Sequence, residues 1–130
     1  MLHGGDVVSF EAWQELQRLG PPLEGVHGNM DDQALRALLP EERIVEVGGA
    51  RIAMVHIAGP AAGRAARLLA RFPGADAIVY GHTHVPEVTR DGDVWILNPG
   101  SPTERRRAPA RAMLMLDVED GEIRPRLIEL

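Results

Sequence analysis

Residues 76–84 read DAIVYGHTH, an apolar strand that runs into the turn Gly81-His82-Thr83-His84. The run of residues 76–80 has the length and composition of a central strand that is buried on both faces. In α/β folds, ligands bind at the carboxyl ends of such strands. Two imidazoles placed directly after one can reach neighbouring metal ions, so this stretch predicts a metal site at one edge of a sheet.

Three further polar side chains, Asp6, Asn29 and His56, also come at the ends of short β-rich stretches. A carboxylate such as Asp6 can bridge two cations. The Asn29 amide can ligate a metal through its oxygen and donate from its NH₂ group to a phosphate oxygen. Each residue also has a plainer interpretation: an aspartate in a turn is common, the Asn29 turn could equally cap a helix, and a lone histidine is more often structural. Their joint placement at strand ends favours the metal site.

The remaining pattern alternates strands with helices and then ends in antiparallel hairpins. Helices are expected after a Ser9 cap, after an Asp31 or Asp32 cap and over residues 60–71; strands are expected at 23–26, 43–47, 51–55 and 76–80; hairpin turns are expected at Gly48-Gly49, Asp91-Gly92 and Asp120-Gly121. This order predicts an α/β fold, a sandwich of two packed sheets flanked by helices, in one domain over residues 1–130.

Composition limits the functions that need to be considered. The net charge of −5 argues against general nucleic-acid binding, which needs surplus cations to displace counterions from phosphates. With no cysteine, a metal must be held by oxygen and imidazole ligands. No apolar run is long enough to span a membrane. The opening MLHGGD lacks the features of a secretory signal, so a cytoplasmic location is expected.

Taken together, the motifs resemble one family. The elements Gly5-Asp6, Gly28-Asn29-x-Asp31, His56 and Gly81-His82-Thr83-His84 occur in the order found in calcineurin-like metallophosphoesterases. The segments HGGDVVSF, GNMDD, GHTHVP and LNPGS resemble the small bacterial and archaeal phosphodiesterase branch. The resemblance extends over nearly the whole chain, and GHTH is its most specific part.

The resemblance implies a ligand set. It makes Asp6 the bridging ligand, with Asn29, His56 and His82 completing one metal site and His84 belonging to the other; Asn29 and His82 are also the expected catalytic residues. The family's second site takes two more ligands from an upstream Asp-x-His motif that this sequence does not contain. We therefore expect a domain that lacks the first strand and helix of the family fold.

The resemblance also implies a function. Relatives use divalent cations, with manganese the first expectation and iron, zinc or nickel the alternatives, to activate water for hydrolysis of phosphodiesters or phosphomonoesters. Some relatives carry a histidine that protonates the leaving group where this chain has Met30, whose thioether cannot donate a proton. The nearest histidine in the sequence is His27, two residues before Asn29.

The partner expected from this function is a small phosphoester, with no membrane or general nucleic-acid partner, and self-association is possible. The alternative is a catalytically weak binding scaffold, as in the retromer small subunit. An unrelated α/β domain is a third interpretation.

Overall fold

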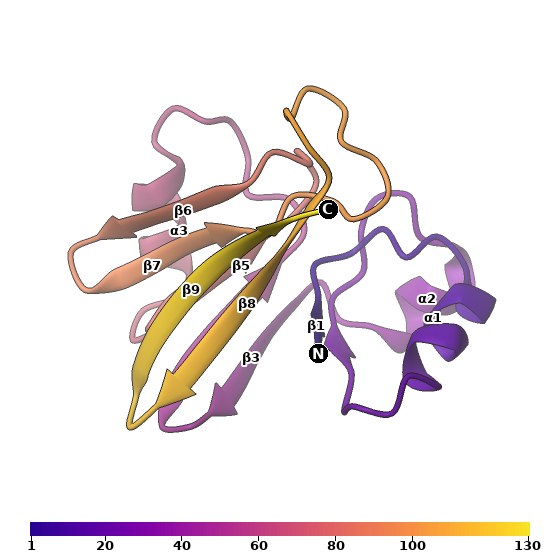
Figure 1. Ribbon diagram of the computed structural model, residues 1–130, viewed down its shortest axis with the longest axis horizontal. Helices are drawn as coiled ribbons and strands as arrows, with labels where there is room; N and C mark the ends of the chain where they lie inside the picture. Colours follow the sequence, from indigo (N-terminus) through magenta and orange to yellow (C-terminus); the bar gives the residue numbers. More distant parts are fainter.

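The computed structural model describes residues 1–130 and contains three sheets and three helices (Figure 1). The elements are β1 Leu2–His3, α1 Phe10–Gln17, β2 Glu24–Gly25, α2 Gln33–Leu38, β3 Glu42–Val47, β4 Ala50–Val55, α3 Arg64–Arg71, β5 Ala77–Tyr80, β6 Glu87–Asp91, β7 Val94–Asn98, β8 Ala112–Glu119 and β9 Glu122–Glu129. No helix has the length and apolar character needed to cross a membrane.

The central sheet has the strand order β3-β4-β5-β7-β6. Strands β4, β5 and β7 are parallel neighbours, while β3 and β6 pair with them antiparallel at the two edges. All four residues of β5 are buried, which confirms the prediction of a fully covered strand over residues 76–80. The parallel strands end at one edge, and the predicted histidine turn follows β5 there.

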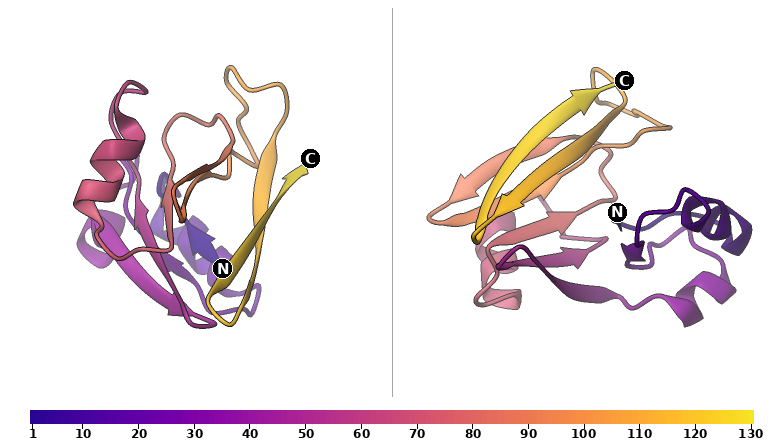
Figure 2. Two further views of the ribbon diagram at one scale, coloured as in Figure 1. Left: turned by 90° about the vertical axis from the view of Figure 1, so that its left-hand side faces the viewer. Right: turned by 60° about the horizontal axis from the view of Figure 1, so that its bottom comes forward.

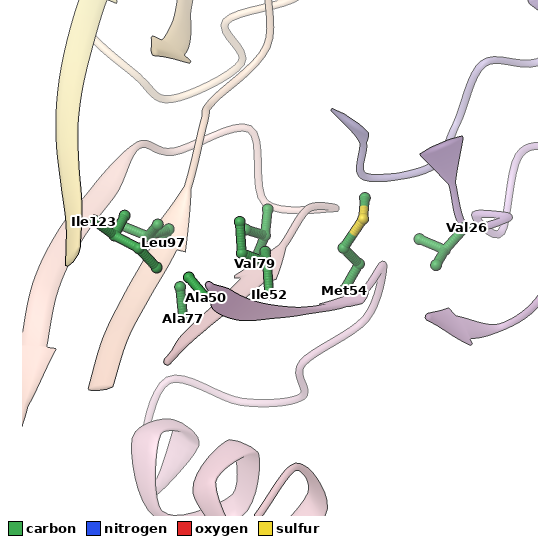
Figure 3. Packing of buried hydrophobic residues seen from close by; sticks show 8 residues of the cluster. All are labelled: Val26, Ala50, Ile52, Met54, Ala77, Val79, Leu97 and Ile123. Carbon is green, nitrogen blue, oxygen red and sulfur yellow. The ribbon is translucent and has the colours of Figure 1, made fainter. Parts of the chain in front are cut away.

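Side chains alternate between two apolar layers, one on each face of this sheet. On one face Ile52, Met54 and Val79 pack towards the β8–β9 hairpin, whose Ile123 joins the same cluster (Figure 3). On the other face Val55 and Ile78 pack with residues of α3. Figure 2 shows the hairpin and α3 on opposite sides of the central sheet. The predicted α/β sandwich of two sheets flanked by helices is therefore confirmed.

The first 40 residues form a separate layer beside the sheets, with the short parallel pair β1–β2 and helices α1 and α2 (Figure 2). A small apolar cluster of Trp13, Leu35 and Leu39 packs the helices together. The Ser9 side chain accepts from the Ala12 N–H at the start of α1, as predicted. At α2 the cap is Asp32, which leaves Asp31 free for another role.

Two predicted element bounds were wrong. The expected strand over residues 23–26 pairs only at Glu24–Gly25. The helix expected over residues 60–71 begins at Arg64, because Gly63 adopts a left-handed φ of 71° that a regular helix cannot contain. The preceding segment is irregular, and Arg67 donates hydrogen bonds to its carbonyls at Ala58, Pro60 and Ala62.

Candidate metal centre

Four of the five predicted ligands converge at the carboxyl edge of the central sheet. Asn29 Oδ1 lies 3.0 Å from His56 Nε2 and 3.0 Å from His82 Nδ1. Asp6 Oδ2 lies 3.1 Å from the same His56 nitrogen. One ligand atom from each of Asp6, His56 and His82 fits within 4.8 Å of the other two. The centre thus joins residues from four separate parts of the chain.

The hydrogen-bond roles at His56 place its Nε2 lone pair against two acceptor oxygens with no positive charge between them. His56 Nδ1 lies 2.6 Å from the Gly4 carbonyl, which can only accept, so Nδ1 carries the proton. In the neutral ring Nε2 is then a lone-pair acceptor, yet it faces the Asp6 carboxylate and the Asn29 amide oxygen. Both oxygens then direct lone pairs at the lone pair of Nε2, and these contacts repel unless a positive charge, either a second proton or a metal ion, lies between the atoms.

The donor set fits a divalent transition metal. Imidazole nitrogen, carboxylate oxygen and amide oxygen are ligands suited to manganese, iron, zinc or nickel. Ligand atoms bound at roughly 2.1 Å on adjacent octahedral positions lie about 3.0 Å apart. The separations of 3.0 and 3.1 Å around His56 Nε2 match this spacing. The residues present therefore suit such an ion, with Asp6, Asn29, His56 and His82 as the groups that would hold it.

The histidine turn is held by a residue whose role sequence reasoning missed. Asn98, fully buried at the end of β7, donates from Nδ2 to the Gly81 carbonyl at 3.2 Å and to Thr83 Oγ1 at 3.0 Å. Both histidines of the turn adopt left-handed φ values, 69° for His82 and 61° for His84. Non-glycine residues seldom adopt this conformation, and it is found mainly where surrounding structure imposes it. Asn98 belongs to the LNPGS segment, and this segment was the part of the sequence that could have drawn attention to it.

Asp31 supports the opposite side of the centre. It is 5% exposed, and its carboxylate accepts from three backbone N–H groups: Gly28 at 2.7 Å, Val8 at 2.6 Å and Asp6 at 3.2 Å. These bonds tie the Asp6 turn to the Asn29 turn. A further bond joins the same two turns, because the Met30 N–H donates to Asp6 Oδ1 at 2.8 Å. Asp31 thus sets the position of Asp6 without lying in the ligand cluster.

Gly28 is required by the close packing of the Asp6 carboxylate. A Cβ atom added at residue 28 would lie 2.2 Å from Asp6 Oδ1, far inside van der Waals contact. We therefore expect Gly28→Ala to displace Asp6 and to weaken Mn²⁺ binding by at least about 10-fold, the scale of losing support for a metal ligand. Calorimetric titration measures this. Gly20→Ala is the comparison for backbone destabilisation away from Asp6: no atom lies within 4 Å of the added Cβ, but the φ of 102° is one that alanine rarely adopts. Equal Mn²⁺ affinity in the two variants would contradict the role given to Gly28.

The surroundings favour the neutral form of His82. Desolvation lowers its pKa first, the neighbouring His56, Arg106 and His84 lower it further, and Asp6 opposes them. A neutral imidazole is the form that binds a metal. His3 lies just outside the centre, and burial lowers its pKa as well. Its Nδ1 accepts from the Gly5 N–H at 3.2 Å, which is a structural contact.

Two further predicted residues lie apart from the cluster. His84 Nδ1 lies 2.8 Å from the Glu104 carbonyl, and His84 is outside the group of ligand atoms that includes His56 and His82. His27 lines a pocket of about 90 Å³ beside Asn29 and His56, together with Glu41. The exposed Met30 side chain is not among the residues lining that pocket.

The sequence and the fold identify the superfamily to which this chain belongs. A model of the calcineurin-like phosphoesterase superfamily domain matches residues 1–121, and the chain belongs to this superfamily. It is 36% identical over 123 residues to a probable metallophosphoesterase of Methanocaldococcus jannaschii, covering 92% of this chain and 61% of that protein. It is 37% identical over 128 residues to a probable metallophosphoesterase of Methanothermobacter thermautotrophicus, covering 95% of this chain and 73% of the relative. The chain thus spans about three fifths of the first relative's length.

Solved structures share the fold. A Thermotoga maritima protein known from solution NMR superposes with a TM-score of 0.76 at 34% identity, covering 99% of this chain and 79% of that one. Two structures at 22% identity each match with a TM-score of 0.75: Vps29 of Entamoeba histolytica in complex with Zn²⁺ and a protein described as a novel archaeal phosphodiesterase. These two cover 98% of this chain and 80% and 81% of their own chains.

Proposed function

We propose that this chain hydrolyses phosphodiester or phosphomonoester bonds at the centre formed by Asp6, Asn29, His56 and His82. The observation that carries this proposal is the meeting of two acceptor oxygens, from Asp6 and Asn29, at the lone pair of His56 Nε2, which calls for a cation. The archaeal relatives described as probable metallophosphoesterases support it. A divalent cation, with manganese our first expectation, would supply Lewis acidity towards a phosphoryl oxygen and lower the pKa of water.

The chain's own residues would bind and orient the substrate. With its Oδ1 turned to the two imidazoles, Asn29 directs its NH₂ group away from them, and that group can donate to a phosphoryl oxygen. His82 is partly exposed beside Asn29, which suits contact with a small phosphoester. The pocket lined by His27 and Glu41 opens next to Asn29 and is our candidate for the leaving-group side.

Metal removal and return tests the proposal. With Mn²⁺ the chain is expected to hydrolyse bis(p-nitrophenyl) phosphate, to stop on chelation with EDTA and to recover when Mn²⁺ is restored. Because four ligands converge while His84 bonds to Glu104, metal analysis should find one tightly held ion per chain. Release of p-nitrophenol is followed by the visible absorbance of its anion. The proposed function is wrong if the chain folds and binds Mn²⁺ but hydrolyses neither substrate. The substrates to be tried are this diester and p-nitrophenyl phosphate, each with manganese, iron, zinc or nickel.

That negative outcome would favour the alternative, a binding scaffold with this fold. Its support in the molecule is the outward face of the β8–β9 hairpin, where Met113 and Met115 are each about two fifths exposed, at 40% and 41%. Isolated exposed apolar side chains are common on soluble domains, so this support is weaker than the donor arrangement at His56. A cytoplasmic location and self-association stay predictions.

A further inference from the structure

The loop between β7 and β8 lies against the histidine turn. Figure 1 shows it in orange, extending beyond the ends of the strands. Two hydrogen bonds connect it to the turn: the Glu104 carbonyl lies 2.8 Å from His84 Nδ1, and Arg106 Nη1 donates to the His82 carbonyl at 3.1 Å. Arg106 adopts a left-handed φ of 47°, a conformation that non-glycine residues seldom use. The loop thus brings one guanidinium beside a residue of the metal centre.

Arg106 has no carboxylate partner. Arg43, Arg71 and Arg124 each form an ion pair with a glutamate, whereas Arg106 forms none. Its one hydrogen bond uses a single N–H of Nη1. A guanidinium has five N–H donors in a planar fork, so four remain available on this exposed side chain.

The charges around the centre decide what these donors can bind. Asp6 is the one carboxylate in the ligand cluster, and a single divalent cation there already gives a net positive charge. The Arg106 guanidinium adds a further positive charge beside it. Like charges held together in this way are stabilised by an anion that contacts both, and a phosphoryl group offers non-bridging oxygens in the geometry that an arginine fork binds.

We propose that Arg106 is a substrate-binding residue that donates to the non-bridging oxygens of the phosphoryl group held at the metal centre. The inference rests on the proposed function for its substrate class, phosphoesters. In this proposal the β7–β8 loop recognises the phosphoryl group. The leaving group would lie on the other side, in the pocket lined by His27.

Binding of phenylphosphonate, a phosphoryl anion that cannot be hydrolysed, tests this without relying on turnover. Calorimetry is done on the Mn²⁺-loaded chain and on the variants Arg106→Ala, Arg106→Lys and Arg107→Ala. Arg107 is the control because it is a neighbouring exposed arginine whose side chain forms no hydrogen bond or ion pair. We expect Arg106→Ala to weaken phenylphosphonate binding by about 10-fold or more, the scale of a lost charge-assisted hydrogen bond. Arg106→Lys should restore part of the loss, because lysine keeps the charge but not the fork. Arg107→Ala should change it less than about 2-fold, as expected for a solvated surface charge.

Mn²⁺ affinity is measured in the same variants. It shows whether Arg106 binds the anion itself or only holds His82 in place through its carbonyl. It should stay the same in all of them. Failure of the wild-type chain to bind phenylphosphonate, equal affinities in the two alanine variants, or a loss of Mn²⁺ affinity in Arg106→Ala would each overturn the inference. Arg106-dependent binding in a chain that hydrolyses nothing would support the inference while the proposed function fails. Hydrolysis that is unchanged in Arg106→Ala, together with unchanged phenylphosphonate affinity, would leave the function standing and remove the inference.

Discussion

Replacing His56 with alanine is expected to weaken Mn²⁺ binding by more than about 100-fold, since even residues that only support metal ligands contribute 10- to 100-fold. His56 Nε2 is the atom on which the Asp6 carboxylate and the Asn29 amide oxygen both converge. Without it the remaining groups offer no common point. Hydrolysis of bis(p-nitrophenyl) phosphate should fall with the metal affinity, and calorimetric titration with Mn²⁺ measures the cause directly.

His27→Ala is the matched control for that experiment. It also removes an imidazole beside Asn29, but His27 only lines the neighbouring pocket and is not among the converging ligand atoms. Its Mn²⁺ affinity should remain near that of the wild type. Circular dichroism of both variants checks that the fold persists, because His56 is 4% exposed and also donates to the Gly4 carbonyl. A His56→Ala chain that is folded and retains full Mn²⁺ affinity would refute the ligand assignment.

Asp31→Ala is expected to lower the free energy of unfolding by about 3 kcal/mol or more. The substitution leaves three backbone N–H groups, at Asp6, Val8 and Gly28, without their acceptor. The bond from Gly28 is buried and the other two are partly buried, and an unsatisfied buried donor costs about 1–3 kcal/mol. Asp31→Asn should cost less, since its single amide oxygen still accepts some of these bonds. Urea denaturation of the metal-free chain gives the values.

The adjacent Asp32→Ala provides the comparison. Asp32 caps α2 by accepting from the Leu35 N–H at 2.9 Å, a contribution of about 1 kcal/mol for an exposed N-cap. The expected order of destabilisation is therefore Asp31→Ala, then Asp31→Asn, then Asp32→Ala. Equal losses at positions 31 and 32 would mean that Asp31 acts as an ordinary helix-terminal residue.

The proximity of His56 and His82 was foreseeable because they follow the parallel neighbours β4 and β5, whose carboxyl ends meet at one edge. Asp6 and Asn29 follow strands of the separate β1–β2 pair, so their approach depends on how the two layers pack. The sandwich was foreseeable because strands alternate with helices first and antiparallel hairpins follow, an order typical of two packed sheets flanked by helices. The helix over residues 60–71 was placed too early because periodicity continues through the irregular segment, where Gly63 interrupts the helix. The spacing of apolar residues does not show that the backbone at Gly63 is left-handed.

The supporting residues were harder to predict because their roles depend on tertiary contacts. The sequence offers Asp31 and Asp32 as equivalent caps, and only the fold shows that Asp31 turns back to the Asp6 turn. Asn98 stands in a recognisable segment, but its bonds to the histidine turn come from the adjacency of β5 and β7. Arg106 lies in a loop without periodicity, where no rule predicts the direction of a side chain.

The candidate metal centre lies where the layer formed by residues 1–40 meets the central sheet. Asp6 and Asn29 belong to that layer, which has its own small apolar cluster around Trp13, while His56 and His82 follow strands of the sheet. Local opening of a protein separates such packed units before either unit unfolds. A cation shared across the junction would bind the closed arrangement alone, so it would act as a clasp whose strength rises with the concentration of free metal. The same ion that supports hydrolysis would then also control how often the two layers come apart.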